Sequence, residues 1–223
     1  RSFINKLAHE LRTPLAIISG NLKRLSRSGD LASVFKRSLE EVRSETRRMV
    51  GLVDKLLVLS ELDTDQYQWF FEPNELHVFV DRWLDSLEPE RLQFVHTNVS
   101  ADCLGSFLEL DQAAFSRIMN NLLDNSLRFV EGKPAFYLSG VLNHGSIELT
   151  VSDAGSLSLS EEKIFTLFER FVRLEENRNP ALGDGSGLGL ALVQALVEGM
   201  NGTVSAGLED DLESSQRRGI KIS

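Results

Sequence analysis

Apolar residues recur every three or four positions through residues 1–66, the spacing that places them on one face of an α-helix. Between residues 3 and 25 the pattern shifts by one residue at Pro14, where the missing backbone donor predicts a bend. Between residues 35 and 56 the steps alternate between four and three, as in a heptad repeat. The heptad positions are Phe35, Leu39, Val42, Thr46, Met49, Val53 and Leu56. The sequence therefore predicts two helices joined by a turn at residues 28–30.

These two helices carry apolar stripes that a single hairpin cannot bury. We expect a second copy of the chain to cover them, which gives a dimeric four-helix bundle. Packing of the helices on the C-terminal part of the same chain is the alternative. The regular heptad spacing favours the bundle, and with it a homodimer formed through the N-terminal helices.

From residue 67 onward the pattern changes to shorter segments of mixed period. Asn143, His144 and Gly145 predict a hairpin turn between two strands. The predicted strands are residues 67–71, 91–99, 106–110, 135–142, 146–152, 203–206 and 219–222, and the predicted helices are residues 75–87, 112–130, 161–168 and 187–200. Helices mixed with mostly antiparallel strands predict a two-layer α/β sandwich. The expected fold class is α plus α/β, with a helical domain at 1–66 and an α/β domain at 67–223.

Charge separates the same two parts. The 223 residues carry a formal net charge of −9, yet residues 1–66 hold 12 Lys and Arg against 9 Asp and Glu, whereas residues 67–223 hold 12 against 24. Such an acidic body argues against nucleic-acid binding, which needs a basic face. Cys103 is the only cysteine, so an internal disulfide framework and a cysteine-built metal site are excluded. A reducing cytoplasm is the expected setting.

No apolar run approaches the roughly 18 residues that span a bilayer. Because the chain opens without Met and without a signal peptide, and stops abruptly at Ser223, we expect a fragment of a longer protein. A membrane would be reached only through parts of the parent protein that lie outside this sequence.

The first candidate for chemistry is the run from His9 to Pro14. His9 and Thr13 lie four apart and share a helix face beside the apolar one, so His9 should be exposed. A neutral imidazole is a competent nucleophile, and Glu10 could hold one ring N–H so that the other nitrogen attacks. Taken alone, such a histidine is more often an ordinary surface residue.

A second candidate lies on the helix predicted at 112–130. Asn121 and Asn125 are four apart, and their side-chain carbonyls could ligate a hard cation such as Mg²⁺ together with phosphate oxygens. Arg128 could reach the same phosphates. The two asparagines could equally cover the solvent side of an amphipathic helix.

Two glycine-containing segments complete the candidates. Asp153 ends a predicted strand, where it could accept a hydrogen bond from an exocyclic amine, and Gly155 would let a ligand ring approach. Both residue types are also common in turns. Residues 183–191 are rich in glycine and lead into a predicted helix, so their N–H groups could cradle phosphates. A plain glycine hinge is the alternative.

In order and spacing these segments resemble the sequence boxes of the sensor histidine kinases of two-component systems. The run from His9 resembles the phospho-acceptor box, residues 121–129 the asparagine box, and residues 153–155 the start of the Asp-x-Gly-x-Gly box. Residues 165–171 resemble the phenylalanine box and residues 185–189 the glycine box. Five boxes in the family's order cover essentially the whole chain, which makes the resemblance specific.

The resemblance implies a dimerisation and phosphotransfer bundle followed by an ATP-binding domain of the Bergerat (GHKL) type. By matching positions, Asn125 would hold Mg²⁺, with Asn121 and Arg128 near the phosphates of ATP. Phe129 would pack near the base, and Asp153 would bind the adenine amine. The backbone of the glycine box would close over the triphosphate through Gly185, Gly187, Leu188 and Gly189.

The resemblance also implies the path of the phosphoryl group. His9 would take it from ATP, with Glu10 as its partner, and pass it to an aspartate in the receiver domain of a response regulator. Glu10 and Thr13 match the family pattern for a second activity, in which they position water to dephosphorylate that regulator.

Three departures from the family pattern keep other readings open. Leu157 stands where the Asp-x-Gly-x-Gly box has its second glycine, residues 217–219 replace the usual Gly-Thr, and residues 207–216 form an acidic insertion expected to be a solvated loop. A regulator phosphatase that binds ATP but transfers it poorly is therefore the runner-up. A non-catalytic dimeric scaffold is disfavoured by the set of Asn121, Asn125 and Asp153, and a chaperone- or topoisomerase-like ATPase would leave the His9 helix without a purpose.

Overall fold

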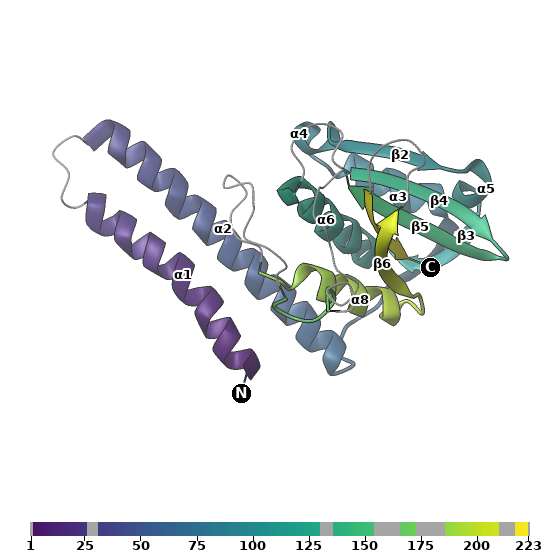
Figure 1. The fold of residues 1–223 in the computed structure, drawn as a ribbon, viewed down its shortest axis with the longest axis horizontal. Helices are drawn as coiled ribbons and strands as arrows, with labels where there is room; N and C mark the ends of the chain where they lie inside the picture. Colours follow the sequence, from purple (N-terminus) through teal and green to yellow (C-terminus); the bar gives the residue numbers. More distant parts are fainter. Residues whose placement is uncertain are drawn as a thin grey trace. The chain divides into compact units, whose positions relative to one another are not determined.

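The computed structural model describes residues 2–25, 31–129, 136–153, 166–172, 186–209 and 217–222 (Figure 1). The chain divides into two compact units, Arg1–Ser60 and Glu61–Ser223, and each is described by itself. The domain boundary expected between residues 66 and 67 stays a prediction.

The first unit is a pair of helices, as the apolar spacing predicts. Helix α1 spans Ser2–Leu25 and contains the buried Pro14, and helix α2 spans Leu31–Asp63 and ends inside the second unit. The turn predicted at residues 28–30 lies outside the described residues.

Much of the apolar surface of these helices is open to solvent in the single chain. On α2, Phe35 is 49% exposed and Val53 is 43% exposed, and both are predicted heptad positions. Their neighbours on the same stripe, Val50 and Leu57, are exposed as well. The heptad residues Met49 and Leu56 are half-buried. The open stripe of α2 is therefore centred on Val53, with Val50 and Leu57 on either side.

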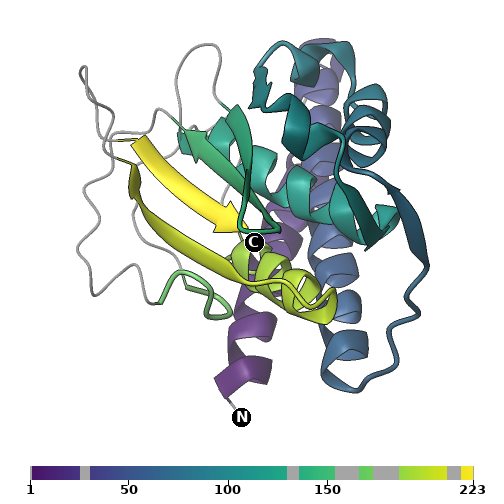
Figure 2. The same ribbon diagram turned by 90° about the vertical axis from the view of Figure 1, so that its right-hand side faces the viewer.

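The second unit is built on a five-stranded sheet within its described part (Figure 2). Its strands run in the order β2-β4-β5-β7-β6, and β2 pairs parallel with β4 whereas the other neighbours pair antiparallel. The strands are β2 (Val95–Val99), β4 (Phe136–Asn143), β5 (Ser146–Asp153), β6 (Val204–Glu209) and β7 (Arg217–Ile222). A separate antiparallel pair joins β1 (Phe71–Glu75) to β3 (Phe107–Asp111).

Among the described elements, three helices cover one face of the large sheet (Figures 1 and 2), namely α3 (Leu76–Asp85), α6 (Gln112–Phe129) and α8 (Gly189–Gly199). Trp83 of α3 and Phe136 of β4 are both fully buried, with ring centroids 5.7 Å apart. Met119 and Leu123 of α6 and Leu192 and Leu196 of α8 extend this core. The two-layer α/β sandwich with mostly antiparallel strands is confirmed.

The local turn signals are confirmed where they rest on backbone chemistry. His144 and Gly145 have φ angles of +50° and +83°, as a tight hairpin between β4 and β5 requires. The predicted helix at 187–200 begins at Gly189 instead, because Gly187 has a φ of +66°, which a right-handed helix does not accept.

The strand predicted at residues 67–71 is wrong. Residues 66–70 have no regular secondary structure, and β1 begins only at Phe71. The alternating aromatic residues contact one another instead. Tyr67 meets Trp69 edge to face, with ring centroids 4.5 Å apart, and Trp69 stacks on Phe71, with ring centroids 5.5 Å apart. The Phe70 N–H donates to the carboxylate of Asp111 at 2.8 Å rather than to a neighbouring strand.

Further elements also differ from expectation. The strand predicted at 91–99 begins at Val95, because Pro89 opens a short helix, α4 (Pro89–Leu92), and another short helix, α5 (Ala101–Leu104), was not predicted. The acidic insertion is not wholly a loop, since β6 continues through Glu209 and pairs with β7; residues 210–216 lie outside the described part. Of the helix predicted at 161–168, only residues 166–168 are described, and they form a turn.

Candidate functional site

Helix α6 carries four of the predicted site residues, Asn121, Asn125, Arg128 and Phe129. Asn121 is buried, with only 6% of its surface exposed, while Asn125 and Arg128 are half-buried. The reading in which the asparagines cover the solvent side of the helix is therefore wrong for Asn121. The side chain of Phe129 lies outside the described residues.

Asn121 has a polar atom whose hydrogen-bonding capacity is not used. Its Nδ2 donates to the carbonyl oxygen of Arg117 at 2.7 Å, but its buried Oδ1 has no hydrogen-bond partner among the described residues. A buried carbonyl left in this state costs roughly 1–3 kcal/mol of stability. The side chain is thus suited to accept a bond from a donor or cation that the chain does not itself provide.

The glycine segment at the start of α8 is held in a strained, close-packed arrangement. The Phe171 N–H donates to the carbonyl oxygen of Gly187 at 2.7 Å, and both residues have positive φ angles, +64° and +66°. A Cβ on Gly187 would lie 2.8 Å from the Cα of Phe171, so no other residue fits there without displacing backbone. Leu188 is fully buried, and Gly189 is the first residue of α8. The backbone N–H groups of a helix start are suited to bind an anion. Of the groups in this segment, the Leu188 N–H donates to Oγ of Ser186 at 3.4 Å, a long bond that an anion would have to replace.

The predicted adenine side of the site is described only in part. Asp153 is the last residue of β5, and its side chain lies outside the described residues. Gly155, Leu157 and Gly185 also lie outside the described residues. The structure therefore places Asn121, Asn125 and Arg128 on α6 and Gly187–Gly189 at the start of α8, which packs against α6.

The residues around His9 belong to the first unit. His9, Glu10 and Thr13 all lie in α1; Thr13 is exposed, and the side chain of His9 is outside the described residues. Glu10 is half-buried, and its Oε2 lies 3.7 Å from Nη2 of Arg48 on α2. Arg48 also contacts Glu45, with Nη1 and Oε2 3.4 Å apart. Arg48 was not predicted, because nothing in its sequence position connects it to Glu10.

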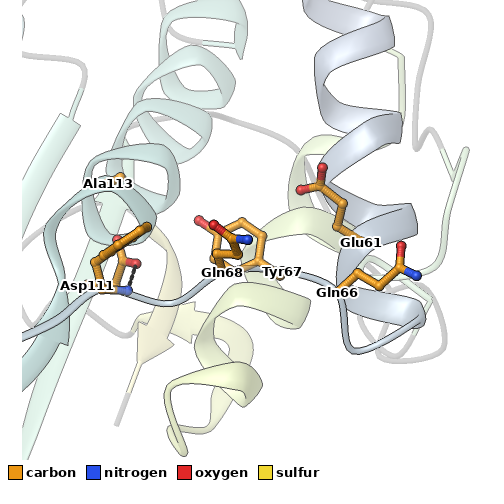
Figure 3. A pocket seen from close by; sticks show the side chains of 7 residues that line it. Glu61, Gln66, Tyr67, Gln68, Asp111 and Ala113 are labelled. Carbon is orange, nitrogen blue, oxygen red and sulfur yellow. Dashed lines mark hydrogen bonds between the residues drawn. The ribbon is translucent and has the colours of Figure 1, made fainter.

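A cavity of about 320 Å³ lies beside the segment that connects the end of α2 to β1 (Figure 3). Its lining residues are Glu61, Gln66, Tyr67, Gln68, Phe70, Asp111 and Ala113, and none of them is a predicted site residue. Asp111 is buried and fully used, since Oδ2 accepts the Phe70 N–H at 2.8 Å and Oδ1 accepts the Ala114 N–H at 2.9 Å. Burial, reinforced by the nearby Asp111 carboxylate, raises the pKa of Tyr67, so this phenol stays protonated at neutral pH.

An ion pair that the sequence does not predict joins the end of α2 to the phenylalanine box. Arg170 donates from Nη1 to Oδ2 of Asp63 at 2.8 Å and from Nη2 to Oδ1 at 2.6 Å. The hydrogen bond from Arg170 lowers the pKa of Asp63, and the same bond raises the pKa of Arg170. The two residues are 107 positions apart, so no local pattern could have paired them.

Two kinds of feature are absent from the described residues. No group of three or more His, Cys, Asp and Glu side chains is placed to hold a metal ion there. None of the described helices has the length and apolar character needed to cross a bilayer.

The residues present nevertheless fit a nucleotide with a hard cation. The unsatisfied Oδ1 of Asn121 calls for a donor or cation, and amide oxygens such as those of Asn121 and Asn125 are ligands that Mg²⁺ accepts together with phosphate oxygens. Gly187 also packs directly against the backbone of Phe171, which fixes the start of α8, and backbone N–H groups at a helix start are suited to bind phosphate oxygens.

Comparisons with known proteins agree on both units. Residues 1–65 match the family model of the His Kinase A (phospho-acceptor) domain. Residues 110–223 match the model of the histidine kinase-, DNA gyrase B- and HSP90-like ATPases.

Individual relatives point the same way. The sensor histidine kinase WalK of Bacillus subtilis is 28% identical over 209 residues, which are 92% of this chain and 34% of that protein. Among solved structures, the histidine kinase AdeS of Acinetobacter baumannii has a TM-score of 0.66 at 24% identity and covers 96% of this chain and 97% of its own. The histidine kinase ThkA, solved in complex with the response regulator protein TrrA, has a TM-score of 0.68 at 16% identity, and the match covers 99% of this chain and 60% of the ThkA chain. The chain thus spans about a third of the length of the curated relative it matches.

Proposed function

The chain belongs to the family of histidine kinase-, DNA gyrase B- and HSP90-like ATPases and has the catalytic core of a two-component sensor histidine kinase; we propose that this core uses ATP to phosphorylate its own His9. The observation that carries the proposal is the succession, in one chain, of a phospho-acceptor match at 1–65 and an ATPase match at 110–223. A chaperone-like or gyrase-like ATPase would have no use for the first segment.

For the nucleotide, each predicted residue keeps a separate role. Asn125 binds Mg²⁺, which offsets the charge of the triphosphate when bound, and Asn121 and Arg128 contact the phosphates. Phe129 packs near the base, and Asp153 accepts a hydrogen bond from the adenine amine, with Gly155 leaving room for the ring. The N–H groups of Gly185, Gly187, Leu188 and Gly189 close over the triphosphate. The unsatisfied Oδ1 of Asn121, an acceptor, supports the binding of a cation beside the phosphates, and the fixed start of α8 at Gly187 supports the binding of the phosphates themselves.

Phosphoryl transfer then depends on positioning and charge neutralisation. A neutral nitrogen of the His9 imidazole attacks the γ-phosphorus, an N–P bond forms, the bond to the bridging oxygen breaks, and ADP leaves. Glu10 accepts the N–H of the other ring nitrogen and takes up that proton as the phosphohistidine forms. Arg48, which pairs with Glu10 at 3.7 Å, orients this carboxylate.

Two partners follow from the proposal. A second copy of the chain covers the open stripe of α2 in a four-helix bundle, and the receiver domain of a response regulator takes the phosphoryl group from His9 onto an aspartate. The complex of ThkA with TrrA, a kinase of similar fold with a response regulator, supports the second partner. The proposal involves no nucleic acid. It places this part of the protein in the cytoplasm, and any contact with a membrane is left to other parts of the parent protein.

A regulator phosphatase is the second candidate, favoured by Leu157 in place of the usual glycine. In this activity Glu10 and Thr13 position the water that hydrolyses the regulator's aspartyl phosphate. The exposed Thr13, one helical turn from His9, is compatible with such a role.

Autophosphorylation with γ-labelled ATP and Mg²⁺ separates the candidates. We expect acid-labile, base-stable label on the wild type and none on His9→Gln, with Asn125→Ala losing label because nucleotide binding fails. His144→Gln, a substitution in the β4–β5 hairpin, should leave the label unchanged. ATP binding without label would favour the phosphatase, and neither binding nor label would contradict both proposals.

A further inference from the structure

The last residue of α2 is tied to the phenylalanine box by two charge-assisted hydrogen bonds. Both nitrogens of the Arg170 guanidinium fork reach both oxygens of Asp63, at 2.8 and 2.6 Å. Bidentate pairing fixes orientation as well as distance, which a single contact does not. The side chains are 35% and 48% exposed, so the pair is accessible and can open without unpacking a core.

Arg170 precedes the residue that holds the glycine segment. Phe171, with its positive φ, donates its N–H to the Gly187 carbonyl at 2.7 Å, and Gly187 packs against the Phe171 backbone so closely that a Cβ would not fit. A non-glycine residue keeps such a φ only when its surroundings hold it there. Anchoring Arg170 is one way to hold Phe171 in this conformation.

The segment that carries Asp63 is also held in place, by backbone hydrogen bonds. The Glu61 carbonyl accepts the N–H groups of Gln66 and Tyr67 at 2.8 and 3.2 Å, which closes the turn after Asp63. Trp69 then lies directly against Gly199 at the end of α8. The end of α2 is therefore a defined anchor point for Arg170 within the second unit.

We propose that Asp63 and Arg170 are positioning residues for the nucleotide: their ion pair holds Phe171 against Gly187 and so fixes the N–H groups at Gly187–Gly189. The inference rests on the proposed role of this glycine segment in phosphate binding. It goes beyond that role by making the end of α2 the point from which a change in the upstream helix reaches the nucleotide site.

Most partly exposed ion pairs contribute little to stability, so stability is not the property to measure. We would measure the affinity of the full chain for a fluorescent ADP analogue with Mg²⁺, and the exchange rate of the Phe171 amide proton without nucleotide. The variants are Asp63→Asn, Arg170→Gln and the double swap of Asp63→Arg with Arg170→Asp. Asp65→Asn is the matched control, because Asp65 is an exposed carboxylate two residues away with a φ of +53°, a conformation that asparagine accepts.

We expect each single variant to weaken nucleotide affinity roughly three- to tenfold, the size of typical remote coupling effects, and to speed Phe171 exchange by a similar factor. The double swap should recover most of both losses, and Asp65→Asn should change neither. Unchanged exchange and affinity in the single variants, or no recovery in the swap, would overturn the proposal. If the wild type binds no nucleotide, the proposed function is wrong, and so is the proposed role of the Asp63–Arg170 ion pair in nucleotide binding. The exchange rates still decide whether the ion pair holds Phe171.

Discussion

At the scale of single residues, two adjacent asparagines of α6 should respond oppositely to the same change. Asn120 Oδ1 accepts the indole N–H of the fully buried Trp83 at 3.1 Å, so Asn120→Leu leaves that donor unpaired and should lower the free energy of unfolding by about 1–3 kcal/mol. Asn121→Leu removes the bond from Nδ2 to the Arg117 carbonyl together with an oxygen that lacks a partner. These two losses offset each other, so stability should stay within about 1 kcal/mol of the wild type. Nucleotide affinity should fall only in Asn121→Leu.

Urea denaturation and nucleotide titration of the two variants provide the comparison. If Asn121→Leu destabilised the protein as much as Asn120→Leu and kept its affinity for nucleotide, the unsatisfied Oδ1 of Asn121 would have no role in nucleotide binding. The sequence shows two neighbouring asparagines, and only the structure separates the one bonded to Trp83 from the one held ready for a ligand.

A second prediction for a single residue concerns the pKa of the Asp63 carboxylate. The hydrogen bond from Arg170 lowers the pKa of Asp63 below the usual value of 3.8. The contribution of the ionised carboxylate to stability is therefore complete above pH 3.8, and it is lost as the pH falls through the lowered pKa of the folded state. The pKa of Arg170 is raised, so both groups remain charged across neutral pH. The Asp63–Arg170 ion pair should therefore not respond to pH in the physiological range. Carboxyl titration by NMR should show the Asp63 pKa rising toward 3.8 in Arg170→Gln; an unchanged pKa would contradict the pairing.

At the scale of elements, a glycine at the end of α8 should behave unlike a helix glycine in open surroundings. Replacing a helical glycine by alanine usually stabilises a helix by about 1 kcal/mol. At Gly199 the new Cβ would lie 2.3 Å from the Trp69 ring, so Gly199→Ala should instead destabilise the second unit by about 1–3 kcal/mol as the ring is displaced.

Denaturation followed by tryptophan fluorescence would measure this loss. In a Trp69→Leu background the clash is absent, and Gly199→Ala should then be neutral or stabilising. Equal destabilisation in both backgrounds would show that the ring contact is not the cause.

The elements also show which signals a sequence carries. Apolar residues three and four positions apart predicted α1 and α2, and the Asn143–Gly145 signal predicted the hairpin, because these patterns depend on neighbours in the chain. The segment at residues 66–70 was misread because its aromatic alternation mimics a strand, whereas its conformation is set by Asp111, 41 positions from Phe70. Side-chain contacts of that range leave no periodic trace in the sequence.

At the scale of the whole molecule, the same distinction applies to the site. Its boxes could be placed on their elements from sequence, since Asn121 and Asn125 lie on α6 as expected and the glycine box leads into α8, although this helix begins two residues later than predicted. The partners that hold those boxes could not be predicted, because each one comes from a distant element. Arg48 reaches Glu10 from the second helix, and Asp63 reaches Arg170 across 107 positions. Motifs thus identify the chemistry, and tertiary contacts determine how it is positioned.

The open stripe of α2 leads to the prediction for the assembly. Val53 is 43% exposed in the single chain, with Val50 and Leu57 exposed beside it, as expected for a surface that a second copy covers. Val53→Glu would place a charge inside that contact and should weaken dimerisation at least a hundredfold, or about 3 kcal/mol. Ser44→Glu is the control, because nine residues at 100° each put the exposed Ser44 on the opposite side of the helix. Sedimentation equilibrium should show dimers for wild type and Ser44→Glu and monomers for Val53→Glu at micromolar concentration. Dimers in all three would mean that the stripe is not the interface, and that the chains associate through another surface.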